Sequence, residues 1–173
     1  TRKGSGPAKV TGTLEGGSFG TFNQTAGISG SYDRFDYAFN VAHFRATDMP
    51  VTPVNLLPPG RQAIGNYYDN VTFSTKLGAD VTENLRFNVV ARHTDATLRF
   101  TGDDFSFFPS VPAAMQSTQH VKQFFTRGEA VVTLLDGRLV NYLGVNYTDH
   151  WNWLKAPDPS TPSINTGDRV QFD

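Results

Sequence analysis

The chain has 173 residues and a mass of 19.0 kDa, the length of one ordinary domain. Its formal net charge of −1 gives no electrostatic indication of a nucleic-acid partner. The lack of cysteine excludes thiol catalysis, disulfides and thiolate metal sites. The chain has a mean hydropathy of −0.35 and no apolar run of about 18 residues, which excludes a membrane-spanning helix. A transmembrane β-barrel is not excluded, because its lipid-facing apolar residues alternate with polar ones and no long apolar run is needed.

Three alternating segments follow a basic, glycine-rich connector at residues 1–7. They cover residues 8–16, 21–29 and 35–42, and in each of them apolar side chains recur at every second position. A period of two is typical of a strand with one apolar and one polar face. The short connection at residues 31–34 predicts that the second and third segments pair antiparallel.

The clearest hairpin lies between Asn70 and Arg92. Val71, Phe73 and Leu77 fall on one face of its first arm, and the second arm repeats the pattern around the polar turn at residues 82–84. Each arm is predicted to be about ten residues long, which is more than the usual five or six and enough for a tilted strand to cross a bilayer.

Two more strands are predicted at residues 123–134 and 139–153, joined by a turn with an Asp136-Gly137 hairpin signal. An eighth begins near residue 169. Short connections (31–34, 82–84, 135–138) alternate with long ones (49–69, 101–122, 155–167), as in outer-membrane barrels with short periplasmic turns and long extracellular loops.

These patterns predict an all-β fold, an antiparallel up-and-down transmembrane β-barrel segment of about eight strands. Taken alone, such a segment is expected to form an open curled sheet with two unpaired edges. The predicted organisation is a connector at residues 1–7 followed by a partial barrel domain at residues 8–173.

The beginning of the chain resembles a known family. The stretches are residues 1–7 (TRKGSGP), 14–21 (LEGGSFGT) and 34–37 (RFDY). They are similar to the junction between plug and barrel in TonB-dependent outer-membrane receptors, and most similar to the vitamin B12 branch. Barrels of this family have 22 strands and a plugged lumen, so the chain corresponds to the N-terminal part of the barrel without the plug.

The resemblance implies a transport receptor of the bacterial outer membrane that takes up a large, scarce nutrient, cobalamin or a ferric siderophore. The implied partners are outer-membrane lipid, the receptor's own plug domain, TonB and the small-molecule metal chelate or cobalamin. No catalysis, cofactor or nucleic acid is expected, and the sequence has no Gly-x-Ser-x-Gly nucleophile motif.

Candidate site residues form two groups. Substrate contacts are expected in the long loops, at Arg61, Tyr67, Tyr68, Asp103, Asp104, Phe105, Phe107 and Phe108. A second group must face the lumen, because a charge at the lipid midplane costs about 2–4 kcal/mol. Its members are Lys76, Arg86, Arg92, Arg127 and Glu129. Two interpretations of the arginines stay open: they dock the plug, or they pair with neighbouring strands inside the wall.

No metal site is predicted. Cobalamin receptors bind calcium through acidic residues of an early extracellular loop, but the loop here offers only Asp48 and Asp69. Two carboxylates are too few for the six to eight oxygens that calcium takes. The four histidines lack a metal-ligand spacing.

Two other interpretations remain. The chain could be a self-contained eight-stranded outer-membrane barrel with a structural or adhesive role. It could also be a soluble antiparallel β-domain that binds a ligand, which would require the apolar face of the sheet to be buried.

Overall fold

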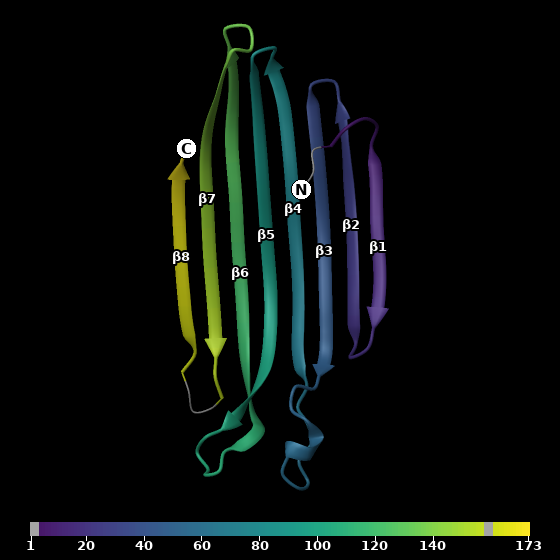
Figure 1. Ribbon diagram of the computed structural model, residues 1–173, viewed down its shortest axis with the longest axis vertical. Coiled ribbons are helices and arrows are strands. Elements are labelled where there is room, and N and C mark those ends of the chain that lie inside the picture. The colour runs from purple at the N-terminus through teal and green to yellow at the C-terminus, as the bar shows by residue number, and fades with distance from the viewer. Residues whose placement is uncertain (1–3, 158–160) are drawn as a thin grey trace.

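The structure is a computed structural model that describes residues 4–157 and 161–173. Eight strands form one antiparallel sheet in the order β1-β2-β3-β4-β5-β6-β7-β8 (Figure 1). The predicted all-β, up-and-down fold is therefore confirmed. The strands are β1 (Lys9–Gly17), β2 (Thr21–Tyr32), β3 (Phe35–Met49), β4 (Asn66–Thr82), β5 (Leu85–Asp104), β6 (Val111–Leu134), β7 (Leu139–Lys155) and β8 (Ser163–Phe172), with one short 3-10 helix, η1 (Val54–Leu56).

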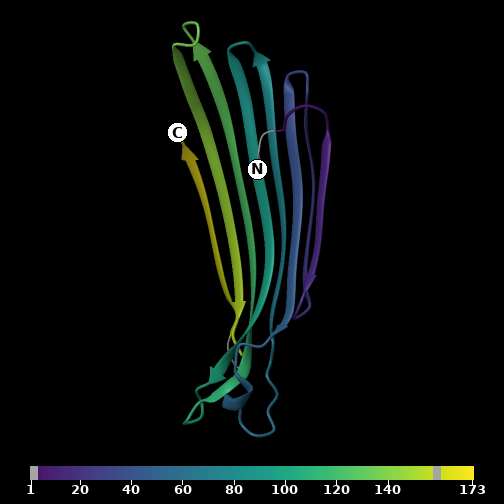
Figure 2. The same ribbon diagram turned by 45° about the vertical axis from the view of Figure 1, so that its right-hand side comes forward.

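The sheet is a single curled layer, as Figure 2 shows, and it is open. Strands β1 and β8 are its two edges, because each pairs with only one neighbour in the described chain. No layer packs on either face, and Ala38 and Ala46 are the only buried hydrophobic residues among those described. The expected open, curled sheet is confirmed, and residues 4–157 and 161–173 form no hydrophobic core.

The register sorts the side chains onto two faces. On one face, called here the apolar face, Val10, Ile28, Phe39, Thr75 and Ala91 lie in one cross-strand row. Because successive residues of a strand point to opposite faces, the adjacent row lies on the other face, called the polar face. It contains Lys9, Ser29, Ala38, Lys76, Val90 and Arg127.

The apolar face carries a band of bilayer dimensions. On β4 its apolar side chains run from Val71 to Val81, a length of about 33 Å at the usual strand rise. A barrel tilt of about 40° reduces this to about 25 Å, the height of the lipid-facing band in outer-membrane barrels. Large side chains in the band are exposed, with Phe73 at 55% and Val81 at 50%.

Most short turns lie at one end of the sheet and the longer loops lie at the other end (Figure 1). Three of the short turns lie at one end, and two of them use positive φ angles: 51° at Asp33, and 53° and 87° at Leu135 and Gly137. The longer loops 50–65 and 105–110 lie at the opposite end, called here the loop end, together with the tight β1–β2 turn and the described ends of the β7–β8 connection. The described part of the chain has no helix long and apolar enough to span a bilayer.

The predicted bounds of the long loops are wrong. The loop expected at 101–122 is reduced to 105–110, because β5 ends at Asp104 and β6 begins at Val111. The other two shorten to 50–65 and 156–162, although residues 1–3 of the predicted connector and 158–160 of the third loop lie outside the described residues. Beyond the apolar band each face mixes polar and apolar side chains, with Arg99 beside Tyr67 on one face and Leu98 beside Gln119 on the other. The alternation that marks a strand in the sequence is therefore lost there.

Candidate functional site

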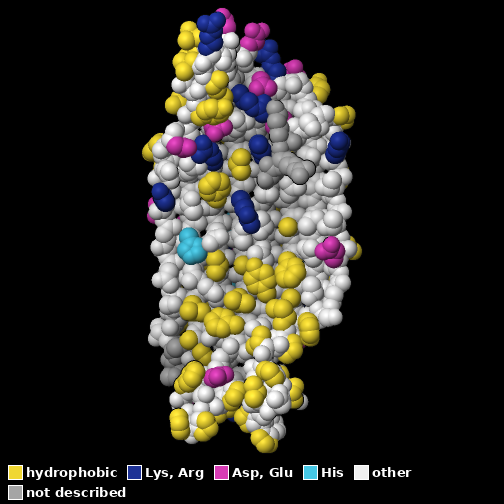
Figure 3. All heavy atoms as spheres, in the orientation of Figure 1, with side chains coloured by type: hydrophobic (Ala, Val, Ile, Leu, Met, Phe, Trp, Pro, Cys, Tyr) yellow, Lys and Arg dark blue, Asp and Glu magenta, His cyan; other side chains and the backbone are white. Residues whose placement is uncertain are grey.

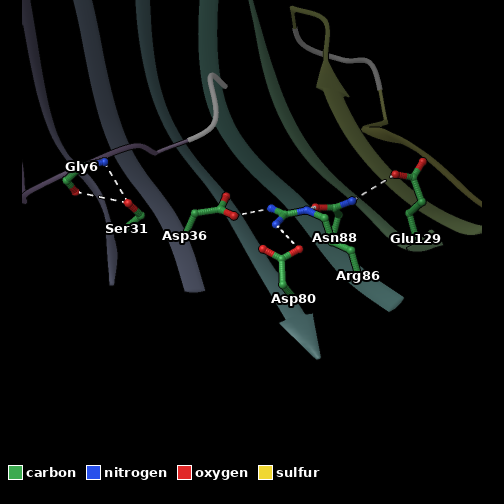
Figure 4. Close-up of polar contacts among 7 residues, drawn as sticks. All are labelled: Gly6, Ser31, Asp36, Asp80, Arg86, Asn88 and Glu129. Atoms are coloured by element: carbon green, nitrogen blue, oxygen red, sulfur yellow. Dashed lines mark hydrogen bonds and ion pairs between the residues drawn. The ribbon is translucent and has the colours of Figure 1, made fainter. Parts of the chain in front are cut away.

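The polar face carries a continuous network of charged side chains toward the short-turn end. At its centre, Arg86 of β5 donates from Nη1 to Asp80 Oδ1 of β4 at 2.8 Å, and its Nη2 forms an ion pair with Asp36 of β3. Its Nε donates to Asn88 Oδ1 at 3.0 Å. One guanidinium thus connects three neighbouring strands, as Figure 4 shows.

The same network continues to the other edge of the sheet. Asn88 Nδ2 donates to Glu129 Oε1 at 3.3 Å, and Glu129 Oε2 lies 3.0 Å from Arg127 Nη2. Arg127 Nη1 donates to Asp173 Oδ2 at 2.9 Å and to Asn146 Oδ1 at 3.2 Å. This chain of contacts, called here the polar network, runs from β3 to the residue after β8.

The Asp36–Arg86 pair is the most buried ion pair of the polar network. The Asp36 side chain is 4% exposed and that of Arg86 is 20% exposed. An ion pair removed from water depends on both partners, because either charge alone is costly to bury. For Arg86 and Arg127 the geometry is therefore that of cross-strand pairing inside the wall, one of the two interpretations that the sequence left open.

Four cations on the polar face lie outside this network. Among residues 4–157 and 161–173, the side chains of Lys9, Lys76, Arg92 and Arg169 have no hydrogen bond or ion pair. Lys76 pairs across the sheet with Val90, and Arg92 with Phe125. In Figure 3 the Lys and Arg side chains gather in the half of this face away from the loop end. These cations are available to a negatively charged partner placed against the polar face.

Gly78 of β4 lies directly under the Asp36–Arg86 pair. A Cβ at this position would overlap Arg86 Nη2 and Asp36 Oδ2. We expect Gly78→Ala to displace the guanidinium and to reduce the free energy of unfolding by about 1–3 kcal/mol. The measurement is urea unfolding in lipid vesicles. In an Arg86→Ala background the same substitution should cost little, and an equal cost in both backgrounds would contradict the explanation.

The N-terminal segment crosses the polar face near this network. Gly6 N–H donates to Ser31 Oγ at 2.8 Å, as Figure 4 shows. The Ser31 N–H in turn donates to the Gly6 carbonyl at 2.8 Å. Gly4 is buried, and a Cβ there would collide with the Gly30 and Tyr37 carbonyl oxygens. The chain therefore enters β1 from the polar side of the sheet.

The two neighbouring tyrosines predicted as loop residues belong to β4 and separate onto opposite faces. Tyr68 lies on the polar face, where its ring is 6.0 Å from that of Phe44 and its hydroxyl accepts from Asn70 Nδ2 at 2.8 Å. Tyr67 lies on the apolar-face side, where it donates to Asp69 Oδ2 at 3.0 Å. Only Tyr68 can therefore share a site with the polar face.

The remaining loop candidates lie at the loop end. Phe105, Phe107 and Phe108 are exposed in the 105–110 loop, Phe108 fully so. Asp104 accepts hydrogen bonds from the hydroxyl and the N–H of Ser106, which lower the pKa of its carboxyl, and the charge of Arg61 lowers this pKa further. The structure thus brings Asp104 and Arg61 within electrostatic range of each other. Asp103 stands beside Asp104 at the end of β5.

The sequence analysis missed several members of these contacts. Asn88, Asn146 and Asp173 join the polar network because of their cross-strand positions. A cross-strand partner can be found only when the register is known, and the register across a long loop is not fixed by its length. The described residues contain no group of three or more His, Asp or Glu side chains arranged to hold a metal ion.

Comparisons with protein-family models, with curated proteins and with solved structures found no match for this chain.

Proposed function

We propose that this chain forms part of the wall of a transmembrane β-barrel in the bacterial outer membrane. The observation that carries the proposal is the single-layer sheet with an exposed apolar face about 25 Å high on β4 and a charged opposite face. In water such a face would be an aggregation liability. In a bilayer it is the surface that lipid chains require.

The proposed role is that of a transport receptor for a large, scarce nutrient, cobalamin or a ferric siderophore, with uptake energised by TonB. The likeness of residues 1–7, 14–21 and 34–37 to that receptor family supports it. Two structural features agree with the role. The unpaired cations Lys76, Arg92 and Arg169 lie on the face that a plug would occupy, and the chain enters β1 from that same face.

A self-contained eight-stranded barrel is the main alternative, and it requires β1 to pair with β8. These strands lie at opposite edges of the sheet, which argues against that closure. A soluble ligand-binding domain requires a second layer over the apolar face. The exposed Phe73 and Val81 argue against that alternative.

The test is uptake by the organism that carries the gene. Deleting the gene should abolish accumulation of radiolabelled cobalamin or ferric siderophore, and so should loss of TonB. The gene should also encode a plug domain before this segment and further strands after it, up to about 22 in total. Unchanged uptake of both nutrient classes would refute the transport role. A heat-modifiable closed barrel formed by these residues alone in detergent would favour the self-contained alternative.

A further inference from the structure

Positive charge on the apolar-face side of the sheet is confined to one end. Within the apolar band, between the short turns and the row of Phe73, no Lys or Arg occupies this face in the described residues. Beyond that row, toward the loop end, it carries Arg45, Arg99, Lys122 and Lys155 together with Asp69 and Asp95. Lys122 Nζ lies 3.7 Å from Asp95 Oδ2, so this lysine already has a carboxylate partner. The face is therefore apolar from the short turns to the Phe73 row and carries charged side chains of both signs directly beyond it.

Aromatic rings accompany these cations. The guanidinium of Arg99 lies 5.2 Å from the ring centroid of Tyr67, and Nζ of Lys122 lies 5.8 Å from that of Trp151. Trp151 and Trp153 share this face and are the only tryptophans of the chain. Amphipathic rings of this kind concentrate at the level of lipid headgroups. The charged end of the face is thus placed at the expected depth of the headgroups.

Two arginines at this level have no carboxylate partner among the described residues. Arg45 and Arg99 line a recess together with Thr47, Asp48, Tyr67 and Gln116. They lie on β3 and β5, two strand spacings and two residues along the strand apart, which separates their Cα atoms by about 12 Å. The carboxylate nearest along the sheet, Asp69, is engaged by His43 Nε2 at 3.1 Å and by the Tyr67 hydroxyl at 3.0 Å. Asp48 is the one acidic residue in the recess.

We propose that Arg45 and Arg99 bind the phosphate groups of a phosphorylated glycolipid in the leaflet at the loop end. A guanidinium group can donate two parallel hydrogen bonds to the oxygens of one phosphate, and it is weakly hydrated. Both properties suit a site at the edge of a bilayer. The neighbouring rings fix the depth of the site. This inference rests on the proposed membrane location, and it adds a specific lipid partner on the outside of the wall.

The experiment places the full chain in phosphatidylcholine vesicles with dansyl-labelled diphosphoryl lipid A, and with dansyl-phosphatidylcholine as the reference lipid. Energy transfer from Trp151 and Trp153 to dansyl reports the lipid beside the site. Transfer to lipid A should exceed transfer to the reference. The double variant Arg45→Gln/Arg99→Gln should lower the affinity for lipid A about 30-fold, because each cation near an anionic surface contributes a factor of about five.

The matched control removes two charges from the opposite end of the sheet, through Arg34→Gln/Arg138→Gln, and should keep the enrichment. Equal transfer to lipid A and to the reference lipid by the inserted wild-type chain would overturn the inference and leave the membrane location intact. Displacement of lipid A by inorganic pyrophosphate would also overturn it, because the recess would then bind small anions. If the chain gains no protease protection in any vesicle, the membrane location itself fails.

Discussion

Replacing Phe39 with Arg is expected to destabilise the chain folded in a bilayer by about 2–4 kcal/mol, the cost of a cation at the lipid midplane. Phe39 pairs with Thr75, near the middle of the apolar run from Val71 to Val81, so the proposed membrane location places its side chain close to the bilayer midplane. The measurement is the urea dependence of folding in phosphatidylcholine vesicles.

The neighbouring residue provides the matched control. Asn40 follows Phe39 directly on β3, but its side chain lies on the polar face, where it is flanked by Gly27 of β2 and Ser74 of β4. Asn40→Arg introduces the same charge one residue away and should cost less than about 0.5 kcal/mol. Phe39→Ala separates the loss of the ring from the gain of the charge. Equal costs for the two arginine variants would mean that the two faces see the same solvent.

Removal of the Arg86 side chain is expected to be the second large effect. Arg86→Ala takes away the guanidinium that pairs with buried Asp36 and with Asp80 and that donates to Asn88. Breaking a buried pair by deleting one partner costs about 3–5 kcal/mol. We expect a value near the lower limit, because the Asp80 side chain is half exposed and can be hydrated.

A double-mutant cycle tests the physical reason. If the cost of Arg86→Ala comes from the charge left on Asp36, then Asp36→Asn should recover part of the lost stability in the Arg86→Ala background. Arg127→Ala is a useful comparison, because its partners Glu129 and Asp173 are more exposed than Asp36. Its loss should therefore reduce the stability of the folded chain by less than about 1 kcal/mol. Additive effects of the Asp36 and Arg86 substitutions would contradict the proposed coupling.

The fold could be predicted from the sequence where one face is apolar. Between Asn70 and Arg92 the period of two is regular, and the structure has the expected antiparallel pair, with Phe73 opposite His93 and Leu77 opposite Val89. Counting alternate residues also predicted that Lys76, Arg86 and Arg127 lie on one face, and the register places them there. This count works because the side-chain period of a strand is fixed by its geometry.

Prediction failed where both faces are polar. The first part of β6 carries Gln116, Ser117, Thr118 and Gln119 in succession, a composition that resembles a loop although it forms a ladder with β5. There the strand is held by main-chain pairing with its neighbour, which leaves no pattern in the side chains. The assignment of Tyr67 and Tyr68 to one loop failed for the same reason.

The central claim is that the apolar face contacts lipid while the opposite face contacts water or protein. Because the chain has no cysteine, single cysteines can be placed at each position from 71 to 80 on β4 and spin-labelled in vesicles. Collisions with oxygen report lipid, and collisions with a water-soluble nickel chelate report the aqueous side. The account predicts that odd positions such as 73 and 77 favour oxygen and even positions such as 74 and 76 do not. Uniform accessibility to the nickel chelate along β4 would contradict it.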